Sequence, residues 1–215
     1  MASTLRVHVP PGFPRGLRDT GISPTVDNGD MTAAYTIRPI TPADDAAMAA
    51  LIRRSLKDVG LDRPGTAYCD PQLDRLAEYY AGLEQPGAYW VVVERLVDGD
   101  GCDAGSTIVG GVGIAAWPGS EDTCELQKLY VAADRRGLGL GRRLLETALA
   151  FAGEHYRQCY LETHSSLEAA CGLYRAMGFE FLDGPLPGGE HSAMDMWAVK
   201  EVRKGDNEIY DNSDK

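Results

Sequence analysis

Apolar and polar residues alternate with two different periods along the chain, and these periods predict the helices and strands of one α/β domain. Apolar residues recur every three to four positions in four segments, as they do on the buried face of a helix. Shorter segments between them are rich in β-branched and aromatic residues, which is typical of strands. The predicted helices are 44–59, 71–83, 139–156 and 167–177, and the predicted strands are 35–40, 88–97, 106–117, 123–131, 158–163, 179–182 and 193–199.

The order of these elements indicates an α/β (α+β) domain over residues 35–200, with a mixed central sheet of about six to seven strands flanked by about four helices. Residues 1–34 are rich in Gly, Pro, Ser and Thr, which predicts a flexible N-terminal leader. The acidic and polar residues 201–215 predict a disordered tail. Three glycines within the predicted strand 106–117 indicate a bulge or a close backbone neighbour.

The most informative run is Arg-Gly-Leu-Gly-Leu-Gly, residues 136–141, between a predicted strand and a long helix. Glycine lets the backbone approach a ligand, and a helix start adds free N–H groups and the positive end of its dipole. The run therefore predicts a backbone cradle for a diphosphate, and a plain glycine-rich turn is the alternative. A Walker loop is excluded because no Lys-Ser or Lys-Thr pair follows, and a dinucleotide fingerprint fails because Arg142 or Leu144 stands where its last glycine is needed.

The spacing Arg-x-x-Gly-x-Gly, from Arg136 to Gly141, resembles the coenzyme A pyrophosphate loop of the GNAT superfamily of N-acetyltransferases. Upstream, residues 124–131 resemble the fourth strand of that family, and downstream, residues 173–179 resemble its Leu-Tyr-x-x-x-Gly-Phe signature. The resemblance covers roughly residues 35–200. It implies a GNAT-like fold and an acyltransferase that uses acetyl-CoA as co-substrate and a primary amine as acceptor.

The same resemblance implies the residues that bind the coenzyme. The edge of the strand 123–131 would pair with the pantetheine arm, and the backbone N–H groups of the glycine run would hold the pyrophosphate. Many relatives have Asn in the turn before Leu-Tyr, where this chain has Ser165 and Ser166, so a hydroxyl would replace that contact. Arg142 and Arg143 either reach coenzyme phosphates or pair with Glu146. The implied coenzyme-binding residues are Leu129, Tyr130, Val131, Arg136, Gly137, Leu138, Gly139, Leu140, Gly141, Arg142 and Ser166.

Glu125 is the candidate catalytic base, because an amine attacks a thioester only after losing its proton. It lies eleven residues before Arg136, the spacing at which some members of the family carry their catalytic glutamate. The alternatives are a solvated strand glutamate and a salt-bridge partner for Lys128. Whether the proton would pass directly or through water is left open.

Tyr174 is the candidate general acid for the departing sulfur, by its match to the Leu-Tyr pair of the signature. A phenol can donate a proton to a thiolate. Because Leu173, Tyr174 and Met177 also lie at helical core spacing, a packed aromatic side chain is the competing interpretation.

The acceptor is expected to contact loops near residues 57–70 and 183–192, with Tyr68, Tyr79, Trp117 and His191 weighed against simple packing. A small-molecule or amino-acid-like amine is the leading hypothesis. The alternatives are a protein or peptide amine and a non-catalytic acyl-CoA-binding module. A nucleotide-binding domain is disfavoured by the spacings above.

Charge and cysteine usage narrow the partners. The chain has 21 basic and 32 acidic residues, a formal net charge of −11, which argues against a nucleic-acid partner and is compatible with an amine substrate. Five cysteines without C-x-x-C spacing predict free thiols in a reducing compartment, with buried core positions for three of them, and four scattered histidines predict no metal site. No apolar run is long enough to cross a bilayer, so we expect a cytoplasmic protein without a membrane partner. The oligomeric state stays open, a homodimer being one alternative.

Overall fold

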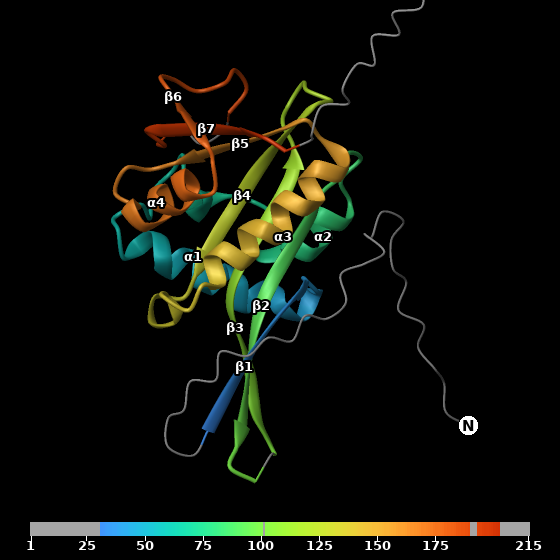
Figure 1. Ribbon diagram of the computed structural model, residues 1–215, viewed down its shortest axis with the longest axis vertical. Coiled ribbons are helices and arrows are strands. Elements are labelled where there is room, and N and C mark those ends of the chain that lie inside the picture. Colours follow the sequence, from blue (N-terminus) through green and yellow to red (C-terminus); the bar gives the residue numbers. More distant parts are fainter. Residues whose placement is uncertain (1–30, 101, 190–192, 203–215) are drawn as a thin grey trace, which may run out of the picture.

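A computed structural model describes residues 31–100, 102–189 and 193–202, and they form one twisted mixed sheet covered by helices on both faces (Figure 1). Within these ranges the sheet has seven strands in the order β1-β2-β3-β4-β5-β7-β6. The strands are β1 Met31–Pro39, β2 Ala88–Asp98, β3 Asp103–Ala116, β4 Thr123–Val131, β5 Gln158–Thr163, β6 Glu180–Leu182 and β7 Met196–Glu201. The helices are α1 Asp45–Lys57, α2 Leu76–Ala81, α3 Leu140–His155 and α4 Glu168–Ala176, with short 3-10 turns η1 Pro42–Asp44, η2 Ala67–Cys69, η3 Leu73–Arg75 and η4 Ala133–Arg135. The predicted fold class is confirmed.

The boundaries of the predicted leader and tail are wrong by a few residues. β1 begins at Met31, inside the predicted leader 1–34, because residues 31–34 pair antiparallel with residues 95–98 of β2. β7 includes Glu201, where the predicted tail begins, because Glu201 pairs with Gln158. Residues 1–30 and 203–215 lie outside the described ranges, so the remainder of both expectations stays a prediction.

The predicted helix 71–83 is shorter than its apolar pattern suggested. A 3-10 turn occupies its first part, and α2 starts only at Leu76. The reason is a tertiary contact, because the carboxylate of Asp45 accepts a hydrogen bond of 2.9 Å from the N–H of Ala77 and so caps α2. The strand β3 starts earlier than predicted, since Asp103 already pairs with Val97.

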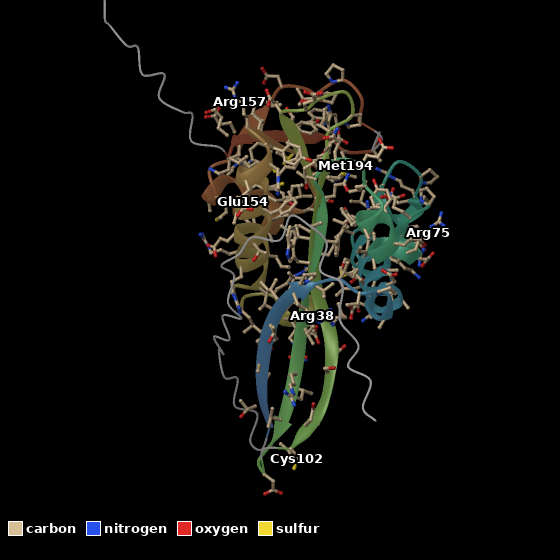
Figure 2. The ribbon with its side chains drawn as sticks, turned by 90° about the vertical axis from the view of Figure 1, so that its right-hand side faces the viewer. Arg38, Arg75, Cys102, Glu154, Arg157 and Met194 are labelled. Carbon is tan, nitrogen blue, oxygen red and sulfur yellow. The ribbon has the colours of Figure 1, made fainter. Side chains whose placement is uncertain are left out.

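Two apolar cores lie on opposite faces of the sheet. Leu144, Leu145 and Ala148 of α3 are completely buried on one face, as the spacing of three to four predicts. Met48 and Ile52 of α1 are completely buried on the other. Figure 2 shows the two helical layers edge-on, with α3 on one side of the sheet and α1 and η3 on the other. Cys124, Cys159 and Cys171 are buried, which confirms their prediction as core residues. Among the described residues no helix combines the length and apolar character that a membrane span requires.

The strands β1, β2 and β3, at one edge of the sheet, extend beyond the helices as a long projection (Figure 1). Closer to the body, the glycines of β3 bring neighbours unusually near the sheet. The pairing of β3 with β4 shifts register between Gly111 and Gly113, which confirms the predicted bulge. A Cβ at Gly113 would overlap the hydroxyl of Tyr80, so only glycine leaves room for that side chain.

Candidate active site

The parallel strands β4 and β5 pair over only three positions and then part. The last pair joins Glu125 to Tyr160, whereas β4 continues to Val131 and pairs there with β3. Beyond Glu125, the edge of β4 that faces β5 therefore presents backbone groups that pair with no other strand of the described ranges. The predicted residues Leu129, Tyr130 and Val131 lie on this open edge, which has the form required for strand-like addition of an extended ligand.

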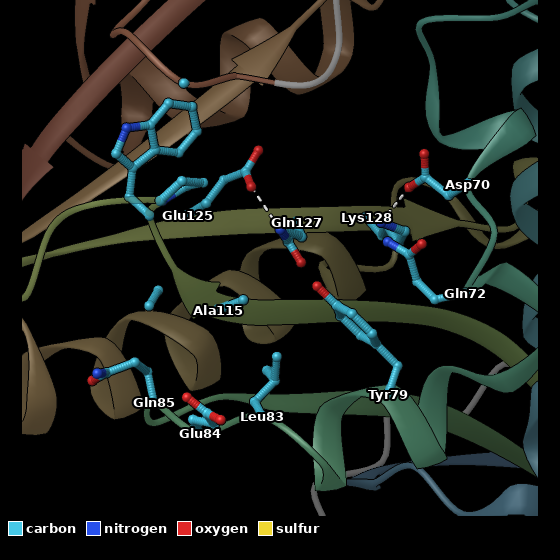
Figure 3. A pocket seen from close by; sticks show the side chains of 14 residues that line it. Asp70, Gln72, Tyr79, Leu83, Glu84, Gln85, Ala115, Glu125, Gln127 and Lys128 are labelled. Atoms are coloured by element: carbon cyan, nitrogen blue, oxygen red, sulfur yellow. Dashed lines mark hydrogen bonds and ion pairs between the residues drawn. The ribbon is translucent and has the colours of Figure 1, made fainter.

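A cavity of about 220 Å³ lies on the α2 side of the sheet, with Glu125 in its wall (Figure 3). Glu125 is only 8 % exposed, so the interpretation of a solvated strand glutamate is wrong. The cavity lies at the loops from which an acceptor contact was expected, after η2 and around Gly188. Its lining consists of Asp70, Gln72, Tyr79, Leu83, Glu84, Gln85, Ala115, Ala116, Trp117, Pro118, Glu125, Gln127, Lys128 and Gly188.

A bulge in β4 brings two consecutive side chains into this cavity. Lys128 has a φ of 51°, the only positive value at a residue other than glycine among the described residues, and both Gln127 and Lys128 line the cavity. In a regular strand two consecutive side chains would point to opposite faces. The ammonium group of Lys128 lies 2.6 Å from a carboxylate oxygen of Asp70, and the backbone oxygen of Lys128 accepts a hydrogen bond of 3.0 Å from the Tyr89 hydroxyl. Both ends of the bulged residue are thereby held in place.

Glu125 is connected to the core through a chain of hydrogen bonds. The side-chain nitrogen of Gln127 donates to Oε2 of Glu125 over 2.6 Å, and the side-chain oxygen of Gln127 accepts from the Tyr80 hydroxyl over 2.6 Å. Burial raises the pKa of Tyr80 well above its ordinary value, so its phenol remains a donor through neutral and mildly alkaline pH. The carboxylate of Glu125 thus has a defined orientation.

The glycine run forms an open loop ahead of α3. Gly137 and Gly139 have φ values of 81° and 75°, and nothing lies within 4 Å of the place where either would carry a Cβ. Gly139 is the N-cap of α3. Across the described structure, no protein acceptor receives a hydrogen bond from the N–H groups of residues 137–142, whereas the N–H of Arg143 already bonds to Gly139. These free donors and the helix start provide the features of an anion cradle.

An ion pair between the half-buried Arg135 and the buried Glu94 holds the turn that leads into this loop. Glu94 of β2 is 2 % exposed and accepts hydrogen bonds from Arg135 over 2.7 and 3.1 Å. The Tyr35 hydroxyl of β1 donates to the same carboxylate over 2.8 Å. Because Arg135 ends η4, directly before Arg136, this contact joins the loop to the far strands of the sheet.

The two serines proposed in place of the missing asparagine have different hydrogen-bond partners. Ser165 donates through its N–H and its hydroxyl to the carboxylate of Asp195, each over 2.7 Å, and these bonds hold the pKa of Asp195 below its ordinary value. Ser166 lies 2.8 Å from Nδ1 of His164, in the turn before α4. The N–H of Ser166 also donates to Nδ1 of His164 over 3.1 Å, so both serines have a protein partner and the ligand contact of Ser166 stays a prediction.

Tyr174 lies in α4 and is 6 % exposed, with its ring packed edge-on against Phe179 at 5.7 Å. The packed-aromatic interpretation therefore describes its ring. Burial raises the pKa of Tyr174. The pKa of Tyr130 on β4 is also raised, mainly by burial and to a smaller extent by the charge of Tyr174.

Other predicted residues have more ordinary surroundings. Arg142 lies 3.8 Å from Glu146 on the exposed face of α3, as the pairing alternative suggested. Tyr79 and Trp117 line the cavity, whereas Tyr68 is half-buried in η2 outside its lining. His191 lies outside the described residues.

The sequence interpretation missed Asp70, Gln127, Lys128 and Tyr80. The glycines of β3 predicted a bulge, but nothing in a single sequence directs the Lys128 side chain of β4 into the cavity, and Asp70 lies far from Lys128 along the chain. The one available signal was Gly113, whose lack of a side chain lets Tyr80 reach β4.

The chain is similar in sequence and in fold to known proteins. Residues 53–179 match the model of the acetyltransferase (GNAT) family. The chain is 38% identical over 170 residues to the uncharacterized N-acetyltransferase YjgM of Escherichia coli (strain K12), covering 77% of this chain and 94% of that protein. An acetyltransferase of the GNAT family from Staphylococcus aureus has a similar fold, with a TM-score of 0.65 at 18% identity over 79% of this chain and 100% of that one. The structure of yncA, a putative acetyltransferase from Salmonella typhimurium with its cofactor acetyl-CoA, has a TM-score of 0.56 at 20% identity over 80% of this chain and 95% of that one.

Proposed function

The chain belongs to the acetyltransferase (GNAT) family of acyltransferases, and we propose that it transfers the acetyl group of acetyl-CoA to the primary amine of a small molecule. One observation carries this proposal. Glu125 stands at the last paired position of β4 and β5 and also in the cavity wall, so the open strand edge and the cavity meet at one carboxylate.

The coenzyme fits the open side of this arrangement. The free N–H groups of residues 137–142 would hold its pyrophosphate, because six donors beside a helix start suit a doubly charged linker. The edge of β4 at Leu129, Tyr130 and Val131 would receive the pantetheine arm. Arg136 and Ser166 would complete the contacts. The acetyl-CoA of yncA supports this use of the fold by similarity.

The chemistry follows from the groups around Glu125. Acetyl-CoA supplies a thioester, and the acceptor nitrogen forms the new amide bond as the bond from carbon to sulfur breaks. Glu125 takes the proton that the amine must lose, and Tyr174 donates one to the departing sulfur. A backbone N–H of the open β4 edge would stabilise the negative charge that develops on the carbonyl oxygen.

The volume of the cavity and the position of Gly188 in its lining favour a small acceptor over a protein. Its volume of about 220 Å³ lies below the roughly 300–1,000 Å³ of typical ligand pockets. Of the segment 183–189, Gly188 lines the cavity, and two hydrogen bonds hold the segment in place: the Trp117 indole donates to the backbone oxygen of Pro187 over 3.1 Å, and the N–H of Leu186 donates to the Tyr160 hydroxyl over 3.2 Å. These bonds hold Gly188 in the lining, where a bulky acceptor would collide with it.

The test measures binding and turnover separately. Calorimetry should detect coenzyme A binding, and thiol release from acetyl-CoA should be accelerated by at least one amine from a panel of diamines, amino acids and arylalkylamines. Binding without turnover on any of them, combined with acetylation of a lysine peptide, would favour the protein acceptor instead. Absence of coenzyme A binding would refute the proposal.

The cytoplasm remains the proposed location. The sequence has five cysteines, an odd number, and all five are free thiols in the structure. Free thiols, two of them exposed, suit a reducing compartment.

A further inference from the structure

We propose that Tyr80 and Gln127 are positioning residues that hold Glu125 as an oriented, ionised carboxylate ready to accept the proton of the amine. This inference rests on the proposed role of Glu125 as base. It starts from the unbroken chain of hydrogen bonds from Tyr80 through Gln127 to Glu125, in which both distances are 2.6 Å. Figure 3 shows the second of these bonds along the cavity wall.

The orientation of the Gln127 amide follows from its two neighbours. Its oxygen can only accept and its nitrogen can only donate. With the oxygen facing the Tyr80 hydroxyl, the nitrogen faces Glu125 and both bonds are satisfied. In the flipped orientation, the amide oxygen would lie against a carboxylate oxygen at hydrogen-bond distance, which is tolerable only if Glu125 is protonated. The amide orientation and the charge of Glu125 are therefore coupled.

Tyr80 can impose this orientation because its own position is determined by the core. It is 5 % exposed, and its ring packs between Tyr79 at 5.1 Å and Tyr89 at 5.2 Å. Gly113 pairs with Gln127 across β3 and β4, and its missing side chain is the space that the Tyr80 hydroxyl occupies. A phenol held in this way has little freedom to turn, so its donor stays directed at Gln127.

The bond that Gln127 donates to Glu125 favours the charged form of this carboxylate. A donated N–H stabilises a carboxylate relative to the neutral acid. Other ionisable groups line the same cavity or interact electrostatically with Glu125, and they stay unchanged in the variants below. These groups are Tyr79 from α2, Cys159 and Tyr160 from β5, and Asp70, Glu84 and Lys128 around the cavity.

The decisive measurement is the titration of the Glu125 carboxyl carbon by NMR in protein labelled with [δ-13C]glutamate, with the signal assigned through Glu125→Gln. This readout needs no acceptor. We expect the midpoint to rise by about one pH unit in Gln127→Met and by about half a unit in Tyr80→Phe. The matched control is Tyr156→Phe, which removes a buried hydroxyl that bonds to the backbone oxygen of Pro86. An unchanged midpoint in Tyr80→Phe, or an equal rise in Tyr156→Phe, overturns the proposal.

Kinetics then separate this role from a purely structural one. With the best amine of the panel, Tyr80→Phe and Gln127→Met should lower kcat about three- to tenfold, move the acid limb of the pH profile upward and leave the KM for acetyl-CoA unchanged. In a Glu125→Gln background, Tyr80→Phe should have no further effect on kcat.

The two proposals fail in different ways. If Glu125→Gln keeps wild-type turnover, the base assignment is wrong and with it the positioning role. If Glu125→Gln loses turnover while Tyr80→Phe keeps the wild-type kcat and pH profile, the base stands and only the positioning role is overturned.

Discussion

The ammonium group of Lys128 and the carboxylate of Asp70 form a buried ion pair of 2.6 Å, with side-chain exposures of only 1% and 12%. The pair joins the bulge of β4 to the segment between η2 and η3 (Figure 3). It therefore ties the wall that carries Gln127 to the opposite side of the cavity. Because Lys128 is engaged in this way, its charge is compensated within the cavity wall.

Removing one member of this pair should be strongly destabilising. Lys128→Met leaves the Asp70 carboxylate buried without its countercharge, and we expect the free energy of unfolding to fall by about 3–5 kcal/mol in urea denaturation. The control is Arg53→Met, which removes the exposed pair of Arg53 with Asp74 at 2.6 Å and should cost no more than about 1 kcal/mol. Equal losses in the two variants would show that burial of the Lys128 pair does not matter.

The glycine loop can be tested with two glycines that share one backbone conformation. Gly139 and Gly60 have φ values of 75° and 71°, and an added Cβ would meet nothing within 4 Å at either. Gly139→Asp and Gly60→Asp should therefore lose similar stability, about 1–2 kcal/mol each, from left-handed strain. Only Gly139→Asp should weaken coenzyme A binding in calorimetry, by about 100-fold or more, because it sets a carboxylate against the pyrophosphate. An unchanged dissociation constant for coenzyme A in Gly139→Asp would show that the glycine loop does not bind the pyrophosphate.

Glu125→Gln should lower kcat by about 100- to 10,000-fold and abolish the acid limb of the pH profile, since the amide cannot accept the proton. Coenzyme A affinity should stay the same, because the glycine loop is untouched. Glu180→Gln, an exposed position in β6, serves as the control for loss of one negative charge. A variant with wild-type rate at all pH values would exclude Glu125 as the base.

Tyr174→Phe should lower kcat roughly tenfold or more without changing coenzyme affinity, because the ring still packs on Phe179 while the proton donor is lost. Burial raises the pKa of Tyr174, so its phenol stays protonated and available at neutral and mildly alkaline pH. Steady-state rates with saturating acetyl-CoA measure this effect. Full activity in Tyr174→Phe would leave only the packing role.

The raised pKa of Tyr174 also predicts how stability changes with alkaline pH. The unfolded tyrosine releases its proton near pH 10, whereas the folded one retains it, so the folded state binds more protons above about pH 10. The contribution of Tyr174 to the free energy of unfolding is therefore fully present below about pH 10, and it is lost as the pH rises through the pKa of the folded state. Tyr174→Phe should show a shallower fall in urea denaturation at alkaline pH. An identical slope in both proteins would contradict burial of the phenol.

The sequence by itself determined the elements and located the glycine loop that is the candidate for binding the pyrophosphate. Periodicity located α3 and β4 nearly to the residue, because these patterns are local and their buried faces agree with the fold. The run 136–141 indicated the loop because glycine spacing acts directly on the backbone. The short α2 was mispredicted because Asp45, distant in sequence, caps it.

Only the tertiary structure decided which side chains meet Glu125. The bulge at Lys128 reverses the alternation that a strand pattern assumes, and it turns two neighbouring residues toward one cavity. Asp70 and Tyr80 reach β4 from segments 58 and 47 residues away, by an ion pair and a hydrogen bond respectively. Contacts of this kind depend on how helices cross the sheet, which is a property of packing, and Gly113 is the one trace of them in the chain.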